Sequence, residues 1–267
     1  MRIILPSYPF ESEGKDPFMI YDLQKASVIK RAAAWLLDLI LVVILACGIG
    51  MVLSDALHYD QQMQTLQACY DKYEKEYDID FEDYTDLTEE EKARYDAANA
   101  ALQKDEEALR TYNMVVNLSL TIVSLSILFS YLVLEFGVPL LFGNGQTVGK
   151  KVFGIALVRV DGVKITTFAL FVRTVLGKYT IETMIPVLVA MMIFIGTIGI
   201  IGPAIVLGLL VLQVMLILTS KTNSALHDHM AATVAVDLAS QMIFATPEDL
   251  IAYKKQVHAE QVKKQTY

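Results

Sequence analysis

Long stretches of apolar residues separate the charged parts of this chain. The 38 residues from 183 to 220 contain no charged side chain, and the 39 residues from 111 to 149 contain one, Glu135. A further stretch, from 32 to 53, is interrupted by Asp38 alone. Because a bilayer core about 30 Å thick requires roughly 20 apolar residues per helix, these stretches predict membrane-spanning helices.

The lengths of these stretches predict an all-α, multi-pass membrane protein with about four spans. A cluster of Gly196, Gly199, Gly202 and Pro203 favours a break within the longest stretch, so its two halves should form a tight hairpin. Three crossings with a re-entrant fourth segment are the alternative. The expected spans are 32–53, 113–142, 183–200 and 203–220.

Residues 54–112 form an acidic, hydrophilic block between the first two spans. They hold 17 acidic and 6 basic side chains, a local charge of −11 in a chain of net charge −8, so the rest carries +3. Apolar residues recur at alternating spacings of three and four from Val52 to Tyr77 and from Tyr95 to Val116, with Asp105 as the one polar position. This pattern predicts an antiparallel coiled-coil hairpin, which serves either as a rigid spacer or as a docking surface for a protein partner or a cationic ligand.

Basic residues indicate the orientation of the spans. Lys25, Lys30 and Arg31 precede the first span, six lysines and arginines lie between 143 and 180, and Lys221 follows the last span. Cytoplasmic flanks are enriched in such residues. We therefore expect the N-terminal segment 1–30, the 143–180 segment and the 240–267 tail to be cytoplasmic, and the acidic block to be extracytoplasmic. The tail should be a helix starting near Pro247, with lysines able to contact anionic lipid at positions 254, 255, 263 and 264.

The segment from Gly143 to Tyr179 contains the most specific sequence. Its GNGQTVGKK stretch resembles a phosphate-binding loop, but Asn144 and Lys151 stand where that motif requires glycine and serine or threonine, so no nucleotide site is predicted. The apolar runs on either side of Asp161-Gly162 predict a small cytoplasmic β-hairpin. Residues 168–178 read as an amphipathic stretch lying at the membrane surface, with Arg173 and Lys178 reaching toward water.

Several ordered motifs resemble the RDD family of prokaryotic membrane proteins. They are Arg31 at the start of the first helix and Asp38 in its middle, GQTVGKKVFGIALVRVDG at 145–162, FVRTVL at 171–176 and ALHDHMAATVAV at 225–236. The resemblance covers about residues 24–238 and places the arginine and the two aspartates that name the family at Arg31, Asp38 and Asp228. It implies a multi-pass protein of the prokaryotic cell membrane, with transport, including cation/proton exchange, proposed for some members. The acidic insertion, and the lack of a basic residue shortly before LHD, depart from the family pattern.

A buried carboxylate within a span needs a partner, because an unpaired charge in lipid is costly. Arg31 and Asp38 are seven residues apart and so share one helix face. Glu135 should reach a comparable depth, which predicts a cytoplasmic vestibule with two carboxylates and one guanidinium. This group is either a structural network that anchors the LHD segment or a transport site. In a transport site, Asp38 or Glu135 exchanges a proton or cation, and Ser124 and Tyr131 supply oxygen ligands.

Other candidate chemistry is weaker. His227, Asp228 and His229 are adjacent, so they do not share a helix face and do not identify a metal site. No nucleophile or metalloprotease pattern occurs, and we expect neither an enzyme, a cofactor nor a nucleic-acid partner. The main hypothesis is cation/proton exchange, with a homo-oligomer or partner protein favoured by the small number of spans. The alternative is a non-transporting scaffold or accessory subunit. The candidate site residues are Arg31, Asp38, Glu135, Thr147, Gly149, Lys150, Arg173, His227 and Asp228.

Overall fold

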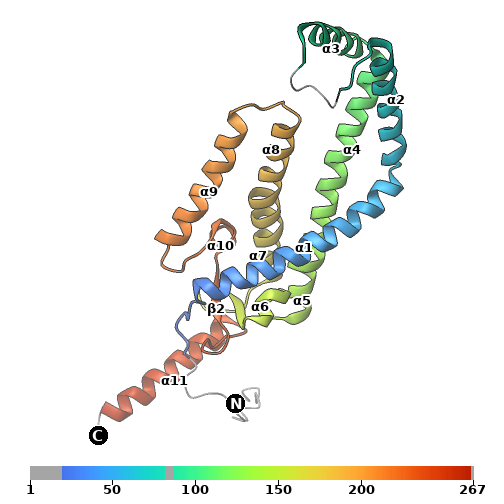
Figure 1. The fold of residues 1–267 in the computed structure, drawn as a ribbon. Helices are drawn as coiled ribbons and strands as arrows, with labels where there is room; N and C mark the ends of the chain where they lie inside the picture. The colour runs from blue at the N-terminus through green and yellow to red at the C-terminus, as the bar shows by residue number, and fades with distance from the viewer. Residues whose placement is uncertain (1–19, 82–86, 266–267) are drawn as a thin grey trace. The chain divides into compact units, whose positions relative to one another are not determined.

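The computed structural model describes residues 20–81 and 87–265 (Figure 1). Most of the expected N-terminal segment and part of the predicted turn, residues 82–86, therefore lie outside the described residues. The described chain forms two compact units. We call residues 20–38, 136–178 and 210–265 the sheet unit, and residues 39–135 and 179–209 the helical unit.

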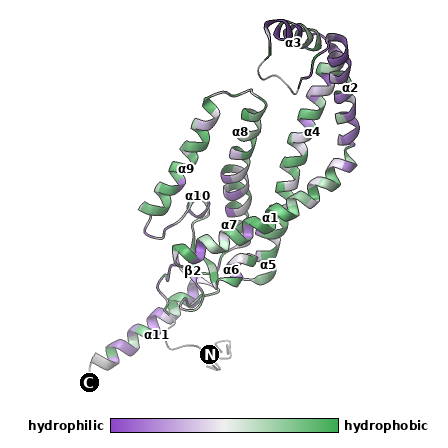
Figure 2. Cartoon of the chain, in the orientation of Figure 1, coloured by the Kyte–Doolittle hydropathy of each residue, from purple (hydrophilic) through white to green (hydrophobic). Residues whose placement is uncertain are grey.

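Within the described residues, four helices are long and apolar enough to cross a membrane, which confirms the predicted number. Large apolar side chains such as Ile44 on the first helix and Leu218 on the fourth are exposed, and much of these two helices is hydrophobic (Figure 2). A surface of this kind is stable only against lipid. The four helices are α1 (Val28–Ala56), Glu106–Phe142, Thr167–Phe194 and α9 (Ile201–Thr219).

The second and third of these helices contain π-helical turns. Glu106–Phe142 consists of α4 (Glu106–Tyr131), a π-helical segment (Leu132–Gly137) and α5 (Val138–Phe142). Thr167–Phe194 consists of α7 (Thr167–Phe171), a π-helical segment (Val172–Met184) and α8 (Ile185–Phe194). Such segments are uncommon and frequently occur at functional sites.

The third helix corrects the sequence prediction. It begins at Thr167, not at 183, and includes the stretch expected to lie on the membrane surface. Arg173 and Lys178 are buried, with 3% and 7% of their surface exposed, and do not reach toward water. The charge of Arg173 is compensated inside the protein by Asp228, a partner that sequence spacing does not reveal.

The break between α8 and α9 follows the prediction. The connection contains Gly196 and Gly199, with φ angles of 77° and 52°. This left-handed backbone is one that glycine adopts without steric cost. The glycine cluster therefore separates two helices that would otherwise form one continuous apolar run.

The acidic block folds into helices α2 (Tyr59–Tyr77) and α3 (Glu89–Leu102) together with the start of α4, and these helices are hydrophilic (Figure 2). The hydroxyl of Tyr73 donates to Asp105 at 2.8 Å, and Ser119 donates to the hydroxyl of Tyr59 at 3.2 Å. The later residue of α2, Tyr73, thus contacts the start of α4, whereas the earlier residue, Tyr59, contacts a position further along α4. The two helices therefore run antiparallel. Thr88 begins α3 with a capping box to Glu91.

The predicted seam along the return arm is wrong beyond Leu102. One carboxylate oxygen of Asp105 accepts from Tyr73 across the two arms, but the other accepts hydrogen bonds from the backbone N–H groups of Glu107 and Ala108 and so caps α4. The chain breaks there, and the buried face of α4 then contains Ala108, Thr111 and Val115. Leu109 and Tyr112, which the heptad pattern placed inside, are exposed.

The predicted β-hairpin is also corrected. Strand β1 (Ile155–Arg159) pairs antiparallel with the distant strand β2 (Thr233–Asp237), and not mainly with the residues that follow it. The Asp161-Gly162 turn does form, but it brings only an isolated bridge between Val158 and Lys164. Both faces of the two strands are covered by apolar residues, which explains their continuous apolar sequences.

Three short or terminal helices complete the sheet unit: α6 (Val148–Val152), α10 (Leu226–Met230) and α11 (Pro247–Gln265). Helix α11 starts where the sequence predicts it, with the hydroxyl of Thr246 accepting from the backbone N–H of Asp249. Lys254, Lys255 and Lys263 are exposed on it. The side chain of Lys264 lies outside the described residues.

Candidate functional site

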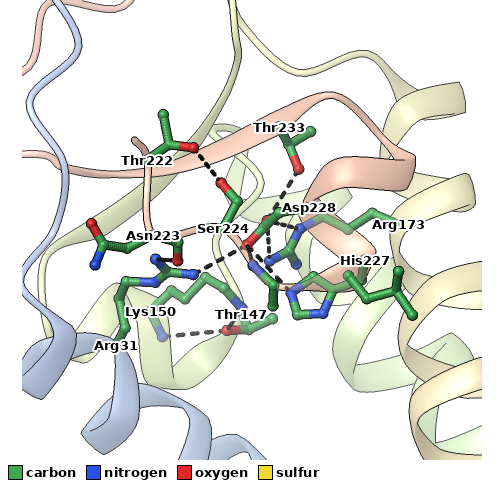
Figure 3. Close-up of polar contacts among 12 residues, drawn as sticks. Arg31, Thr147, Lys150, Arg173, Thr222, Asn223, Ser224, His227, Asp228 and Thr233 are labelled. Atoms are coloured by element: carbon green, nitrogen blue, oxygen red, sulfur yellow. Dashed lines mark hydrogen bonds and ion pairs between the residues drawn. The ribbon is translucent and has the colours of Figure 1, made fainter. Parts of the chain in front are cut away.

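The carboxylate of Asp228, on α10, is the buried centre of the sheet unit (Figure 3). One oxygen accepts from Arg173 Nε at 3.0 Å and from the hydroxyl of Thr233 at 3.2 Å, and Arg173 Nη2 lies 2.9 Å away. The other oxygen accepts from Arg31 Nη2 at 3.1 Å and from the backbone N–H of Ala225 at 3.3 Å. This one carboxylate therefore links α1, the third helix and β2.

The surroundings of Asp228 fix its charge. Burial alone would raise the pKa of this carboxyl group, but the positive charges of Arg173, His227 and Arg31 and the hydrogen bond from Arg173 outweigh it. The pKa of Asp228 is consequently held well below its usual value. At neutral pH the residue is an ion-pairing anchor and not a proton carrier.

Arg31 also positions the turn after α9. Its Nη1 donates to the backbone carbonyl oxygen of Asn223, and Lys25 Nζ donates to the carbonyl oxygen of Lys221 at 2.9 Å and to the side chain of Asn223 at 3.3 Å. Asn223 adopts a left-handed φ of 52°. Two cations, Arg31 on α1 and Lys25 just before it, thus hold the turn that leads into the LHD sequence.

Asp38 has a different set of partners. Its carboxylate accepts from the hydroxyl of Thr147 at 2.5 Å and from the backbone N–H of Gly149 at 2.7 Å, and Lys150 Nζ lies 3.7 Å away. Thr147 is in turn the N-cap of α6, and it accepts from the backbone N–H and the side chain of Lys150. The aspartate in the first span therefore binds the N-terminal turn of α6, where helix N–H groups favour a negative charge.

Close backbone contact accompanies this hydrogen bonding. A Cβ on Gly149 would collide with the backbone carbonyl oxygen of Ala34, one turn before Asp38 on α1. Likewise, a Cβ on Gly177 in the third helix would lie 2.6 Å from Cβ of His227. Glycine at these two positions lets α6 and the LHD segment pack directly on the membrane helices.

The structure gives different partners to two residues that the sequence grouped together. Arg31 pairs with Asp228 and Asp38 with α6, although the helix spacing predicted that both face one vestibule. Glu135 is buried in the helical unit, and its placement near Asp38 stays a prediction. Sequence reasoning missed the contributions of Gly177 and Asn223, because their partners His227 and Arg31 lie far away along the chain. It also missed Thr233, which is only five residues from Asp228 but belongs to a strand that the sequence did not predict to pair with β1.

The histidines do not build a metal site. His227 Nε2 lies 3.6 Å from Asp228, whereas His229 is exposed. Within residues 20–81 and 87–265, no group of three or more histidine, cysteine, aspartate or glutamate side chains is arranged to hold a metal ion. The main partners of Asp228 are cationic, which makes this carboxylate unsuited to binding a further cation.

Polar residues of the helical unit form a second group. The hydroxyl groups of Tyr131 and Thr183 are hydrogen-bonded at 2.8 Å, and the hydroxyl of Tyr179 donates to the backbone carbonyl oxygen of Ser124 at 3.2 Å. Ser130 is fully buried, and Glu135 is 3% exposed. Hydroxyl groups thus join the second and third helices, and Glu135 is buried one turn beyond Tyr131 on the second helix.

The family model described as "RDD family" matches residues 25–232, which is more than half of the chain. The chain belongs to the RDD family. No curated protein and no solved structure matches it. With four candidate membrane-spanning helices, this RDD protein is an integral membrane protein.

The geometry gives a physical reason for the residues that resemble the RDD signature. In this RDD protein the arginine and two aspartates assigned to that signature, Arg31, Asp38 and Asp228, all lie in the sheet unit. Arg31 and Asp228 form one ion pair, and Asp38 holds α6. The three residues therefore attach the short helices and the sheet to the first span.

Proposed function

We propose that this RDD protein exchanges a small cation for protons across the membrane and that Glu135 is the carboxylate that exchanges them. The observation that carries the proposal is the position of Glu135, which is buried within a π-helical segment of the second candidate span. An ionisable residue inside a membrane helix is costly, and such residues commonly mark ion pathways. π-Helical turns favour the same interpretation.

The two buried aspartates, Asp38 and Asp228, are less suited than Glu135 to exchanging a cation for a proton. If Asp228 released its cations to bind a substrate, it would leave Arg173 buried without its counter-ion, and breaking such a pair costs about 3 to 5 kcal/mol. Asp38 would have to release the N-terminal turn of α6. We therefore assign structural roles to these two residues and the exchange role to Glu135, which differs from the Asp38 alternative that the sequence left open.

Hydroxyl groups near Glu135 supply the oxygen atoms that a small cation prefers. Tyr131 and Thr183 lie within hydrogen-bonding distance of each other, and Ser130 is buried on the same helix. From Ser124 to Glu135 the helix advances about 16 Å at 1.5 Å per residue, or roughly half of the bilayer core. This length supports a polar route through part of the membrane.

The test is ion flux in proteoliposomes that contain the purified full-length protein and an internal pH-sensitive dye. Adding Na⁺ or K⁺ outside should change the internal pH, and Glu135→Gln should abolish this response. Glu107→Gln, an exposed position on the hydrophilic end of the same helix, should keep it. The proposal is overturned if the wild-type protein moves neither cation nor protons, or if folded Glu135→Gln retains the flux.

A non-transporting scaffold is the second candidate, favoured by the way in which Asp38 and Asp228 are used as anchors. In this case the hydrophilic helices α2 and α3 bind a partner protein and the membrane helices hold them in place. Absence of flux, together with a crosslinked partner that is lost when residues 59–102 are replaced by a short linker, would support it. Retention of the partner after that replacement would contradict it.

We also propose the orientation that the basic residues indicate. Both ends of the chain and residues 143–166, which precede the third candidate span, then face the cytoplasm, and α2 and α3 lie on the opposite side of the membrane. In the segment between the second and third apolar stretches, basic residues outnumber acidic ones, whereas residues 54–112 carry a charge of −11. This charge difference supports the orientation.

A further inference from the structure

The two adjacent lysines of α6 lie in different environments. Lys150 is buried, and its ammonium group lies 3.1 Å from the hydroxyl of Thr147 and 3.7 Å from Asp38. Lys151 is exposed, and its ammonium group lies 3.7 Å from the centroid of the Phe142 ring. Phe142 is the last residue of the second candidate span. Lys150 therefore contacts buried polar groups, while Lys151 lies at the end of a membrane helix.

Exposed apolar side chains flank both Lys151 and its partner Phe142 along the chain. Its neighbour Val152 is 65% exposed, and Leu141, beside Phe142, is 85% exposed. The rings of Phe136 and Phe171 are 6.0 Å apart, which places the end of the second span next to α7, where Phe168 is 76% exposed. A cation over an aromatic ring, bordered by exposed apolar groups, is typical of a protein surface at the level of lipid headgroups.

The local charge is complementary to an anionic headgroup. Residues 136–160 contain Lys150, Lys151 and Arg159 but no aspartate or glutamate. With Lys150 committed to Asp38, the ammonium group of Lys151 is available to a phosphate. Basic groups near the surface of a membrane attract acidic lipids in this way.

We propose that Lys151 and Phe142 form a binding site for an anionic phospholipid. The phosphate accepts hydrogen bonds from the ammonium group of Lys151, and the acyl chains lie along Leu141 and Val152. This site is independent of the proposed exchange at Glu135, which lies in the other unit. The proposed site gives a role to Lys151, the second lysine of the GKK sequence. Unlike Lys150, this lysine is exposed and does not pair with Asp38.

The single tryptophan of the chain provides a local probe. Trp35 is 56% exposed and directly follows Ala34, whose backbone lies against α6 at Gly149. The full-length protein is placed in phosphatidylcholine nanodiscs that contain increasing amounts of brominated phosphatidylglycerol or brominated phosphatidylcholine. Because bromine quenches tryptophan only at short range, stronger quenching by phosphatidylglycerol reports its enrichment beside α6.

We expect the wild-type protein to show this preference and Lys151→Gln to weaken it about fivefold, the effect of one lysine at an anionic surface. Lys151→Arg should keep it, as should the matched control Lys255→Gln, an exposed lysine on α11. Equal quenching by both lipids in the wild-type protein overturns the proposal. A preference that survives in Lys151→Gln, or that Lys255→Gln weakens equally, overturns it as well.

Discussion

Arg31 and Arg173 form ion pairs with Asp228 from two different membrane helices. Asp228 thereby attaches α10 and β2 to these helices. Asp228 is fully buried, and its low pKa means that the ion pairs persist at neutral pH. Because its pKa is depressed, this contribution to stability is present above the pKa of an unfolded aspartate and is lost as the pH falls through the folded value. The anchor is therefore insensitive to physiological changes of pH.

Asp228→Asn tests this anchor. The substitution keeps the shape of the side chain but leaves Arg173 buried without a counter-ion, so we expect a loss of about 3 to 5 kcal/mol in the free energy of unfolding. The measurement is the thermal unfolding midpoint of the purified protein in detergent. Asp237→Asn is the matched control, because Asp237 pairs with the exposed Lys30 and should change stability by less than about 1 kcal/mol. Equal midpoints for the two variants would contradict the role of Asp228.

Sequence analysis could identify these residues but not all of their partners. An aspartate in a lipid-embedded helix must be paired, so the importance of Asp38 follows from its position alone. Its observed partner Thr147 lies 109 residues away, and helix periodicity relates only residues within one helix. For the same reason the spacing of Arg31 and Asp38 suggested a shared site, whereas tertiary contacts direct the two side chains to different partners.

At the scale of elements, α6 is held against α1 by hydrogen bonds to Asp38 and by the absence of a side chain at Gly149. Gly149→Ala places a methyl group against the backbone carbonyl oxygen of Ala34, which cannot move without bending α1. We expect a loss of about 1 to 3 kcal/mol, as for other overpacked positions. The readout is the same unfolding midpoint.

Gly48→Ala is the control for Gly149→Ala. Gly48 also lies in a helical segment, and a Cβ there meets no atom within 4 Å. Alanine is the better helix former, so this variant should be neutral or slightly more stable. If Gly149→Ala is as stable as Gly48→Ala, the close approach of α6 to α1 is not as described.

The elements that the sequence predicted well are those whose pattern is local. Four apolar helices and the break at Gly196 and Gly199 follow from composition and glycine conformation. The errors arise where another contact, local or distant, overrides a periodic pattern. Asp105 fits a heptad numerically, yet its carboxylate caps α4 and shifts the buried face by one residue. The β1 sequence is compatible with a hairpin, yet β2 offers a longer antiparallel pairing.

At the scale of the whole molecule, the distribution of charge is the feature that determines sidedness. The acidic helix α2 carries Cys69, and α1 carries Cys47 within a candidate span. A thiol reagent that cannot cross the membrane therefore tests the proposed orientation. Burial, followed by the charges of Asp105 and Glu107, raises the pKa of Cys69. Labelling should consequently require mildly alkaline buffer, because the thiolate is the reactive form.

We expect intact cells to be labelled at Cys69 and not in the Cys69→Ala variant. In that variant, Glu90→Cys on the exposed side of α3 should restore labelling, while Lys263→Cys on α11 should be labelled only after lysis. The reason is the positive-inside rule, which places the lysine-rich flanks in the cytoplasm. Labelling of Lys263→Cys in intact cells, with Glu90→Cys protected, would reverse the orientation. It would also move the Lys151 site, which belongs to the same unit as α11, to the outer leaflet.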